Sequence, residues 1–263
     1  PRVDQETGHG LVTDVCLKRK IRNYVEAVEE GVPGYRIYIK DDVPLTQRDQ
    51  EACAHFGIED IKKIKKDNPD VDKKIRDFMC GNFFDIRTFG AVMTTFVQGA
   101  LNCGQVRGPV QLGFARSIEP IVPQEITITR TAITTLKDSQ GKRTTMGHKF
   151  IVPYALYRVE GYVSANLARK VTGFSEADLE LLWKAILQMF ELDRSAARGN
   201  MATRELIVFR HESELGNAPA YQLFDRIRVN KKMSEAPARS YHDYDVHVDT
   251  ENLPEGVTCT RMN

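Results

Sequence analysis

The sequence lacks any long apolar run and any large excess of charge of one sign. No stretch approaches the roughly 20 apolar residues that a membrane-spanning helix needs, and no secretory leader is visible, so neither a membrane protein nor an exported one is expected. The 37 Lys and Arg residues are balanced by 36 Asp and Glu residues, which leaves a net charge of +1. Any binding to nucleic acid must therefore use local basic patches rather than overall charge.

Cysteine is scarce, and the cysteines that are present are not spaced as pairs. The five cysteines are scattered, odd in number and never form a C-x-x-C motif. This pattern indicates reduced thiols and predicts a cytoplasmic location. The chain begins at Pro1 rather than at a methionine, from which we expect that an N-terminal segment is missing.

Motifs of catalytic and cofactor-binding sites are also missing. The sequence contains no H-E-x-x-H, no G-x-S-x-G and no paired cysteine ligands. His242-Asp243 is similar to the metal-binding pair of phosphohydrolases, but no other histidine is suitably placed. Strand alternation instead puts Asp243, Asp245 and His247 on a solvent face and Tyr244, Val246 and Val248 inward. The sequence thus predicts a non-enzymatic protein with no metal site and no cofactor.

Helical and strand periodicities are interleaved irregularly, which predicts an α+β fold with helices on one face of a sheet. We expect helices over residues 13–30, 176–192 and 219–225, and a charged helical segment over 46–80 broken near Gly57 and Pro69. Strands are expected over residues 35–40, 83–93, 110–116, 148–164, 204–211 and 241–249. Residues 125–136 lead through a polar, mobile tip at 137–143 into a return strand, which predicts a long hairpin.

Apolar stripes identify the buried faces of the two main helices. In the first, Thr13 is the expected N-cap, and the stripe consists of Leu17, Ile21, Tyr24 and Val28. In the second, Ser175 and Asp178 predict a capping box, and the stripe consists of Leu179, Leu182, Ile186 and Phe190.

The first helix carries a basic cluster, Lys18, Arg19, Lys20 and Arg22, near its N-terminus. Acidic residues follow at its other end, which is the reverse of the order that the helix dipole favours. Lys18, Arg19 and Arg22 lie opposite the apolar stripe, so they are expected to be solvated. An ordinary wet face with ion pairs is one interpretation; an anion site at the helix N-terminus is the other, and we favour it.

Three other segments carry candidate phosphate-binding residues. Gln105 and Arg107 lie between Gly104 and Gly108, in a segment that lacks the layout of a nucleotide P-loop. The flanking glycines could let Arg107 approach a phosphate closely. A turn with an exposed arginine fits the segment equally well. On the hairpin return, Met146 could wedge against a nucleobase while Arg143 and Lys149 bind phosphates, or the segment could be a surface loop. Arg194 and Arg198, just past a helix, indicate a loop that can bind phosphate.

Several segments in combination resemble one family, the backbone subunit of the type I-C CRISPR surveillance complex (Cascade). These segments are residues 7–23, 85–90, 104–112, 143–147, 151–154, 193–199 and 215–219. The resemblance implies one domain over residues 1–263, a modified RNA-recognition-motif (ferredoxin-like) palm. It further implies a helical, fingers-like insert at about 41–82 and a thumb hairpin at about 119–149. Family members begin with an additional strand that this sequence lacks.

The resemblance also implies a function. Copies of the protein would stack into a helical filament that coats CRISPR guide RNA and presents it for pairing with target DNA. The implied partners are guide RNA, further copies of the chain, other surveillance-complex subunits and, indirectly, a recruited helicase-nuclease. Lys18, Arg19 and Arg22 would contact RNA from the palm, Met146 would be the thumb wedge, and Gln105, Arg107 and Arg116 would lie near the RNA path.

Two alternatives differ in class from a guide-RNA-binding subunit. The first is a metal-independent endoribonuclease that processes CRISPR repeat RNA with a histidine such as His148 as acid or base. The second is a protein-assembly module whose basic residues are incidental.

Overall fold

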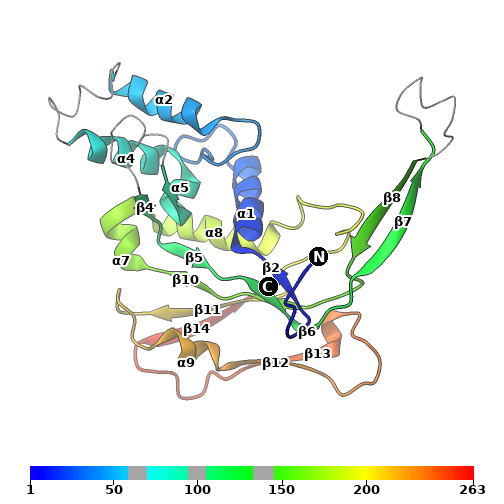
Figure 1. Ribbon diagram of the computed structural model, residues 1–263. Coiled ribbons are helices and arrows are strands. Elements are labelled where there is room, and N and C mark those ends of the chain that lie inside the picture. Colours follow the sequence, from blue (N-terminus) through cyan, green and yellow to red (C-terminus); the bar gives the residue numbers. More distant parts are fainter. Residues whose placement is uncertain (59–69, 94–104, 133–144) are drawn as a thin grey trace.

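The structure is a computed structural model, and it describes residues 1–58, 70–93, 105–132 and 145–263. Helices and strands alternate irregularly along the chain, which confirms the expected α+β class. Figure 1 shows the main helices gathered above a series of short strand pairs, while one strand pair, β7–β8, projects away from the body. Among the described helices, none is long and apolar enough to span a membrane.

The strands pair antiparallel into small sheets. The largest sheet in the described chain has the order β1-β2-β6-β9, formed by Arg2–Val3, His9–Val12, Ala115–Pro120 and Tyr157–Arg158. The two-stranded sheets are β3 (Gly90–Val92) with β4 (Gln105–Arg107), β5 (Val110–Leu112) with β10 (Gly161–Val163), β7 (Gln124–Arg130) with β8 (Thr145–Ile151), β11 (Leu206–His211) with β14 (Val257–Met262), and β12 (Ile227–Lys231) with β13 (Tyr244–Val248).

The first hydrophobic core lies around α1 (Asp14–Val28) and α8 (Glu176–Gln188). Leu17, Ile21 and Tyr24 of α1 are buried there as predicted, but Val28 is 51% exposed and Val25 takes its place. The helix thus buries a face rotated slightly from the expected one.

Helix α8 begins where the sequence places it. Ser175 Oγ accepts the Asp178 N–H, and the Asp178 carboxylate accepts the Ser175 N–H, so the predicted capping box is confirmed. Of the expected stripe, Leu182 is fully buried, whereas the other three members are only partly buried against the core. The buried face also includes residues that the stripe missed, namely Leu181, Ala185 and Met189.

The second core lies in the helical insert. It is formed mainly by α2 (Leu45–His55) and α4 (Val71–Asn82), which end and begin near the predicted breaks at Gly57 and Pro69. Ile75 and Met79 of α4 pack there with Phe83, all with 0% exposure. The helical stretches expected before Gly57 and after Pro69 are therefore confirmed, while the stretch expected between the two breaks lies mostly outside the described residues.

Helix α5 (Phe84–Phe89) joins the two cores and corrects the strand expected over residues 83–93. All six of its residues are buried; Phe84 and Phe89 belong to the first core and Ile86 to the second. A helix buried all round has no polar stripe, so its period was not readable from the sequence. Only Gly90–Val92, as β3, is a strand.

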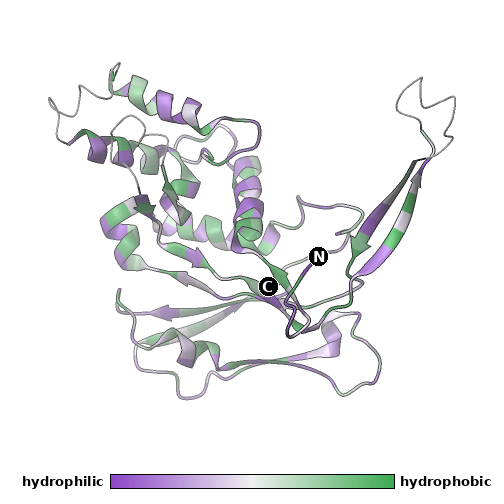
Figure 2. Cartoon of the chain, in the orientation of Figure 1, coloured by the Kyte–Doolittle hydropathy of each residue, from purple (hydrophilic) through white to green (hydrophobic). Residues whose placement is uncertain are grey.

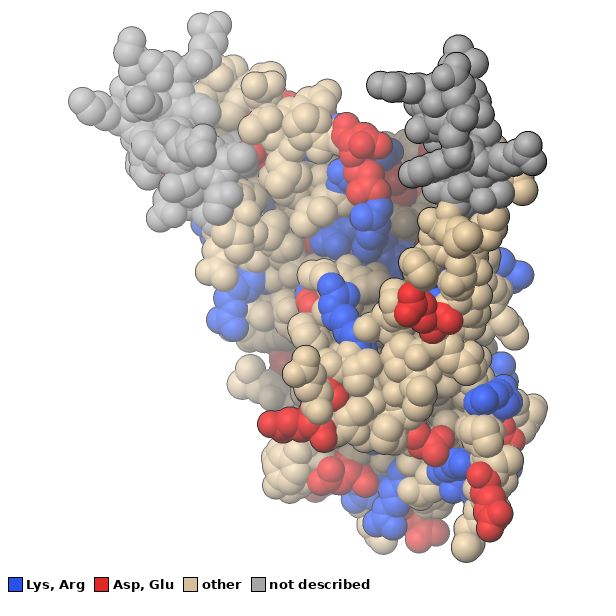
Figure 3. Space-filling model, turned by 45° about the vertical axis from the view of Figure 1, so that its right-hand side comes forward, with Lys and Arg blue, Asp and Glu red and all other residues tan. Residues whose placement is uncertain are grey.

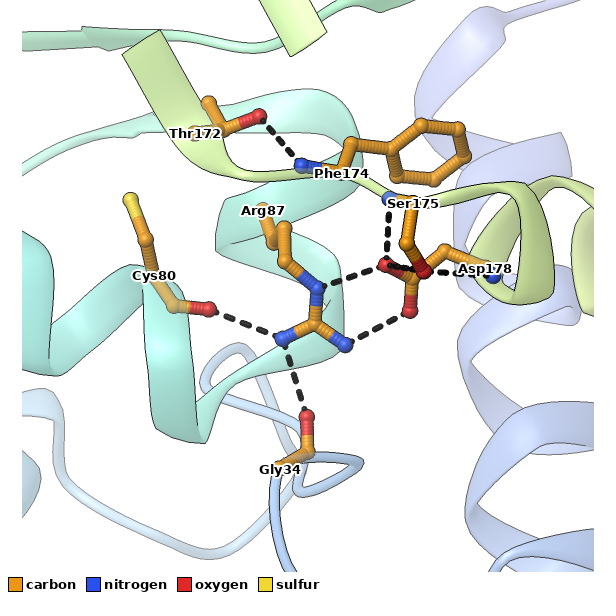
Figure 4. A network of polar contacts seen from close by, with 7 residues as sticks. All are labelled: Gly34, Cys80, Arg87, Thr172, Phe174, Ser175 and Asp178. Carbon is orange, nitrogen blue, oxygen red and sulfur yellow. Dashed lines mark hydrogen bonds and ion pairs between the residues drawn. The ribbon is translucent and has the colours of Figure 1, made fainter. Parts of the chain in front are cut away.

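Two buried ion pairs extend from α5 to the long helices. Arg22 of α1 donates to the Asp85 carboxylate at 2.8 Å, and Arg87 donates two hydrogen bonds to Asp178 of α8 at 2.7 and 3.0 Å. Figure 4 shows the Arg87 guanidinium also reaching the carbonyls of Gly34 and Cys80. Burial raises the pKa of Asp178, but the hydrogen bonds from Arg87 and Ser175 outweigh it and hold that pKa below 3.8.

The strand expected over residues 35–40 is absent; this stretch makes one isolated bridge, from Arg36 to Phe83. Adjacent residues Ile37 and Tyr38 are both buried, so the apparent alternation is not real. The N–H groups of Tyr38 and Ile39 donate to the Asp85 carboxylate instead of to a strand partner. The Asp85 side chain thus accepts the hydrogen bonds that a neighbouring strand would accept in a sheet.

The strand expected over residues 110–116 is divided between β5 and β6. The two segments pair with different neighbours, β10 and β2, and Phe114 between them is 54% exposed whereas Ala115 is buried. The prediction that Val110, Leu112 and Phe114 share one buried face is therefore wrong for Phe114. Strands β1, β2, β12 and β14 were not predicted.

The C-terminal elements largely follow the sequence pattern. Strand β11 and helix α9 (Ala220–Phe224) confirm two of the expected segments. In β13, Tyr244 is buried while Asp245 and His247 are exposed, as predicted. Asp243 is an exception, because it lies in a 3-10 turn before the strand and caps it by accepting the Ser240 N–H.

The β7–β8 hairpin confirms the expected long hairpin. Seven residues of each strand pair in register, from Gln124 opposite Ile151 to Arg130 opposite Thr145. The tip predicted at residues 137–143 lies outside the described residues. In Figure 1 the hairpin stands apart from the helices.

Gly108 lies where two backbone segments pass close to each other, a role that was not predicted from the sequence. A Cβ atom at Gly108 would lie 2.2 Å from both the Gly90 nitrogen and the Phe89 carbonyl carbon. The backbones after α5 and after β4 thus approach too closely for any side chain.

We therefore expect Gly108→Ala to lower the free energy of unfolding by about 3 kcal/mol, measured by urea denaturation. Gly81→Ala is the matched control, because Gly81 lies in α4 with nothing within 4 Å of the added Cβ. That change should stabilise the protein by about 0.5 to 1 kcal/mol. Equal stability of the two variants would contradict the close approach.

Candidate nucleic-acid interface

Lysine and arginine side chains gather on the side of the body that faces the hairpin. Figure 3 shows them in a recess between the body and the hairpin, with acidic side chains immediately above. In Figure 1, α1, the segment after α8 and the β2–β6 pair lie on this side. We call this surface the recess and define it by Lys18, Arg19, Lys20, Arg116, Arg194 and Arg198.

Arg19 lies on the accessible part of α1, whereas Lys18 is largely enclosed, contrary to the expectation that it is solvated. Lys18 Nζ pairs with Asp14 at 2.9 Å, and its side chain is 13% exposed. Arg19 pairs with Asp41, and the side chains of both are more than half exposed. An exposed pair of this kind stabilises the fold little, so the Arg19 guanidinium is available to another anion.

Lys20 and Arg22 are buried, and the expectation that Arg22 is solvated is wrong. The Lys20 side chain is 7% exposed and pairs with Asp193, while that of Arg22 is 10% exposed and pairs with Asp85. Helix α1 is covered on more than one side, so the residues flanking its stripe are also enclosed. Arg22 holds the helix to α5 rather than facing a ligand.

The segment after α8 brings two more candidates to the recess. Arg194 pairs with Glu191, and its side chain is 65% exposed. The Arg198 side chain is 45% exposed and lies 3.7 Å from the Asp193 carboxylate. Residues about 175 positions after α1 thus meet it in space, and Asp193 bridges the two segments.

Arg116 completes the basic side of the recess from β6. Its side chain is 59% exposed and donates to Asp4 at 2.9 Å. This hydrogen bond is the main cause that holds the pKa of Asp4 below 3.8. In the sheet Arg116 lies opposite Arg158, which instead donates to the backbone carbonyls of Phe224 and Ile227.

Gln105 and Arg107 do not join the recess. Both are exposed on β4, which lies on the far side of α5 and α8 from the hairpin in Figure 1. They border a separate hollow of about 440 Å³ with Ile39, Val92 and Leu167. The turn considered for this segment is a strand, and its flanking Gly108 serves backbone packing.

The hairpin presents apolar side chains on both faces. Met146 is 69% and Phe150 54% exposed on one face, and Ile126 and Ile128 are 42% and 50% exposed on the other. Figure 2 shows hydrophobic positions along both strands. Strand alternation puts Lys149 on the face opposite Met146, so the two predicted contacts cannot act on one nucleotide from one face. Arg143 lies outside the described residues.

Two exposed apolar residues and the partner of His148 were missed by sequence reasoning. Val15 and Leu192, which are 64% and 57% exposed, place apolar surface next to the cations of the recess. His148 Nδ1 lies 2.7 Å from Glu125 Oε1 on the Met146 face of the hairpin. His148 was named from the sequence as an acid or base of the alternative endoribonuclease, whereas its partner Glu125 carried no readable signal.

The described residues contain no cluster of side chains that could bind a metal ion. No group of three or more His, Cys, Asp or Glu side chains there is arranged to hold an ion. The recess instead combines exposed guanidinium groups with exposed apolar side chains. Exposed guanidinium groups of this kind are typical of surfaces that bind the phosphate backbone of single-stranded nucleic acid.

Comparison with known proteins places the chain in a family. Residues 1–249 match the family described as CRISPR-associated protein Cas7. The chain belongs to this family. It is also 25% identical over 279 residues to a CRISPR-associated protein Cas7 of Haloferax volcanii, covering 97% of this chain and 75% of that one.

A solved structure entitled CRISPR RNA-guided surveillance complex, pre-nicking, is also similar to the chain. The TM-score is 0.44 at 14% identity, over 77% of this chain and 70% of the matched one. This partial overlap carries no argument about the site.

Arg22 and Arg19 provide a direct test of the burial pattern on α1. Arg22→Met leaves the buried Asp85 carboxylate without its cation, so we expect a loss of about 3 to 5 kcal/mol in the free energy of unfolding. Arg19→Met removes an exposed pair and should change it by no more than about 0.5 kcal/mol. Chemical denaturation of both variants measures the difference, and similar values for the two would contradict it.

Proposed function

We propose that this Cas7-family protein is a multi-copy, non-catalytic subunit that binds the backbone of CRISPR guide RNA. In this proposal copies of the chain form the helical filament of an antiviral surveillance complex of type I-C. The observation that carries the proposal is the set of exposed arginines in the recess, Arg19, Arg116, Arg194 and Arg198.

The chemistry of the recess fits a single strand of RNA. Guanidinium groups bind phosphates in a fixed geometry and do not lose their charge. Exposed apolar side chains beside them, such as Val15 and Leu192, offer surface to bases. Such a site reads the backbone and leaves the sequence of the guide to base pairing.

The other sequence candidates take different places in the proposal. Arg22, being buried, positions α1, whereas the buried Lys20 is paired with Asp193 at the recess, and Lys18 lies at the edge of the recess. Met146 is the proposed wedge of the thumb, and Arg143 and Lys149 are proposed contacts of its strands. Gln105 and Arg107 are proposed to contact RNA or another copy beyond the recess.

The proposed assembly follows the division of the chain. The sheets and α1 form the palm, the insert with α2 and α4 forms the fingers, and β7–β8 forms the thumb. An isolated two-stranded ribbon is marginally stable in water, so apolar residues on both faces of β7–β8 favour partners on each face. We propose RNA and a neighbouring copy of the chain as the partners of the two hairpin faces. Target DNA would pair with the guide RNA. Other complex subunits and a helicase-nuclease would join this assembly in the cytoplasm.

The salt dependence of RNA binding tests the recess. Replacing Arg19, Arg116 and Arg194 together by alanine should remove three phosphate contacts. The slope of log affinity against log salt concentration should then fall by about 0.7 per contact, or about 2 for the triple variant. Fluorescence titration of a labelled single-stranded RNA over a range of salt concentrations measures the slope.

The control is a triple alanine variant of Arg169, Arg210 and Arg228, which are exposed arginines outside the recess. It changes the net charge equally and should leave the slope nearly unchanged. If both triple variants lose the same slope, the recess is not the RNA site. If neither loses any, the RNA-binding proposal itself fails.

The His148–Glu125 contact favours one second candidate, a metal-independent endoribonuclease. A carboxylate 2.7 Å from a histidine nitrogen can orient the ring for acid–base catalysis. Both side chains are more than half exposed on the hairpin, whereas catalytic pairs are commonly held in enclosed sites. This exposure is why the binding proposal is preferred.

Incubation with repeat RNA in the presence of a chelator separates the two functions. The binding proposal predicts no site-specific cleavage and identical RNA patterns with the wild type and His148→Ala. Cleavage by the wild type that His148→Ala abolishes would establish the endoribonuclease instead. Ordered oligomers of fixed length formed without RNA would favour the assembly module.

A further inference from the structure

Asp193 occupies the position between two cations of the recess. Its carboxylate contacts Lys20 Nζ and lies 3.7 Å from the Arg198 guanidinium. Lys20 comes from α1, whereas Asp193 and Arg198 come from the segment after α8. Lys20 is enclosed, whereas the Arg198 side chain is 45% exposed.

Lys20 requires an anion in this place. Its side chain is 7% exposed and lies over the ring of Phe190, with Nζ 5.9 Å from the ring centroid. Burial, and then the charge of Arg198, lowers the pKa of Lys20. A buried ammonium beside a second cation is stable only with a counter-charge, which Asp193 supplies.

The segment that carries Asp193 has few attachments to the body. Its described backbone hydrogen bonds are local: the N–H groups of Glu191, Asp193 and Arg198 donate to the carbonyls of Gln188, Phe190 and Ser195, each three residues earlier. It forms no ladder with any sheet beyond the bridge between Ser195 and Arg198. The segment can therefore turn outward without breaking the sheets or α8.

We infer that Asp193 is a specificity-determining residue that competes with RNA phosphates for Lys20 and Arg198. This inference rests on the proposed function. A phosphodiester carries one negative charge, as the Asp193 carboxylate does, so exchanging one for the other keeps the charge of the site unchanged. Binding exchanges an intrachain carboxylate for a phosphate of the RNA.

The competition selects for a polymer. A single phosphate ion has no advantage over a carboxylate that is already tethered beside the two cations. A strand held at the same time by Arg19, Arg116 and Arg194 presents its next phosphate at high effective concentration. The strand can then displace Asp193, whereas inorganic phosphate cannot.

The test compares Asp193→Asn with Glu191→Gln in the full-length chain. Both remove one negative charge from the same segment, but Glu191 pairs with Arg194, which is already exposed. We expect Asp193→Asn to bind a short fluorescent poly(U) oligonucleotide about fivefold more tightly than the wild type, and Glu191→Gln less than about twofold. Asp193→Asn should also become sensitive to inorganic phosphate as a competitor.

A second measurement separates competition from a general change in charge or folding. In a Lys20→Met background, Asp193→Asn should lose most of its gain, because the contested cation is gone. Thermal unfolding establishes that each variant is folded. The inference is overturned if Asp193→Asn binds no more tightly than Glu191→Gln, or if its gain is the same with and without Lys20.

Failure of the proposed function gives a different result. In that case neither the wild type nor either variant binds the oligonucleotide at low salt, and the inference falls with it. Binding by the wild type without a gain in Asp193→Asn overturns the inference alone. Binding only by Asp193→Asn supports it.

Discussion

The buried ion pairs of α5 are the interaction on which the rest of the structure depends. Within six buried residues this helix supplies Asp85 to Arg22 of α1 and Arg87 to Asp178 of α8. Breaking either pair leaves a charge without its partner inside the protein, at a cost of about 3 to 5 kcal/mol. Because α1 carries Arg19 and α8 leads into Arg194, the geometry of the recess follows from these two contacts.

Local signals in the sequence predicted the elements that depend on local chemistry. The capping box of Ser175 and Asp178, the breaks in the insert and the alternation in β7–β8 all act within a few residues and are confirmed. The signal failed at α5, since a helix enclosed by two cores has no exposed stripe. It also failed at residues 35–40, where the Asp85 carboxylate, 46 or 47 positions away, takes up the N–H groups.

The basic residues of the candidate site were readable, but their environments were not. Lys20 and Arg19 are neighbours in sequence, yet one is 7% and the other 58% exposed, because the segment with Asp193 covers only the first. Each described cation of the recess has a carboxylate partner, several of them distant in sequence. A short stretch of sequence shows the basic residues but not their distant carboxylate partners. It therefore predicts the positions of the positive charges but not which of them are neutralised by an ion pair.

The separation between Lys20 and Asp193 has a consequence for synthesis of the chain. The two residues are 173 positions apart, and Arg87 precedes Asp178 by 91. At typical rates of translation, Asp193 emerges on the order of ten to thirty seconds after Lys20. During that interval α1 carries its cations and apolar face without α8. Until Asp193 emerges, Lys20 on the nascent chain is without the carboxylate that balances its charge in the folded protein.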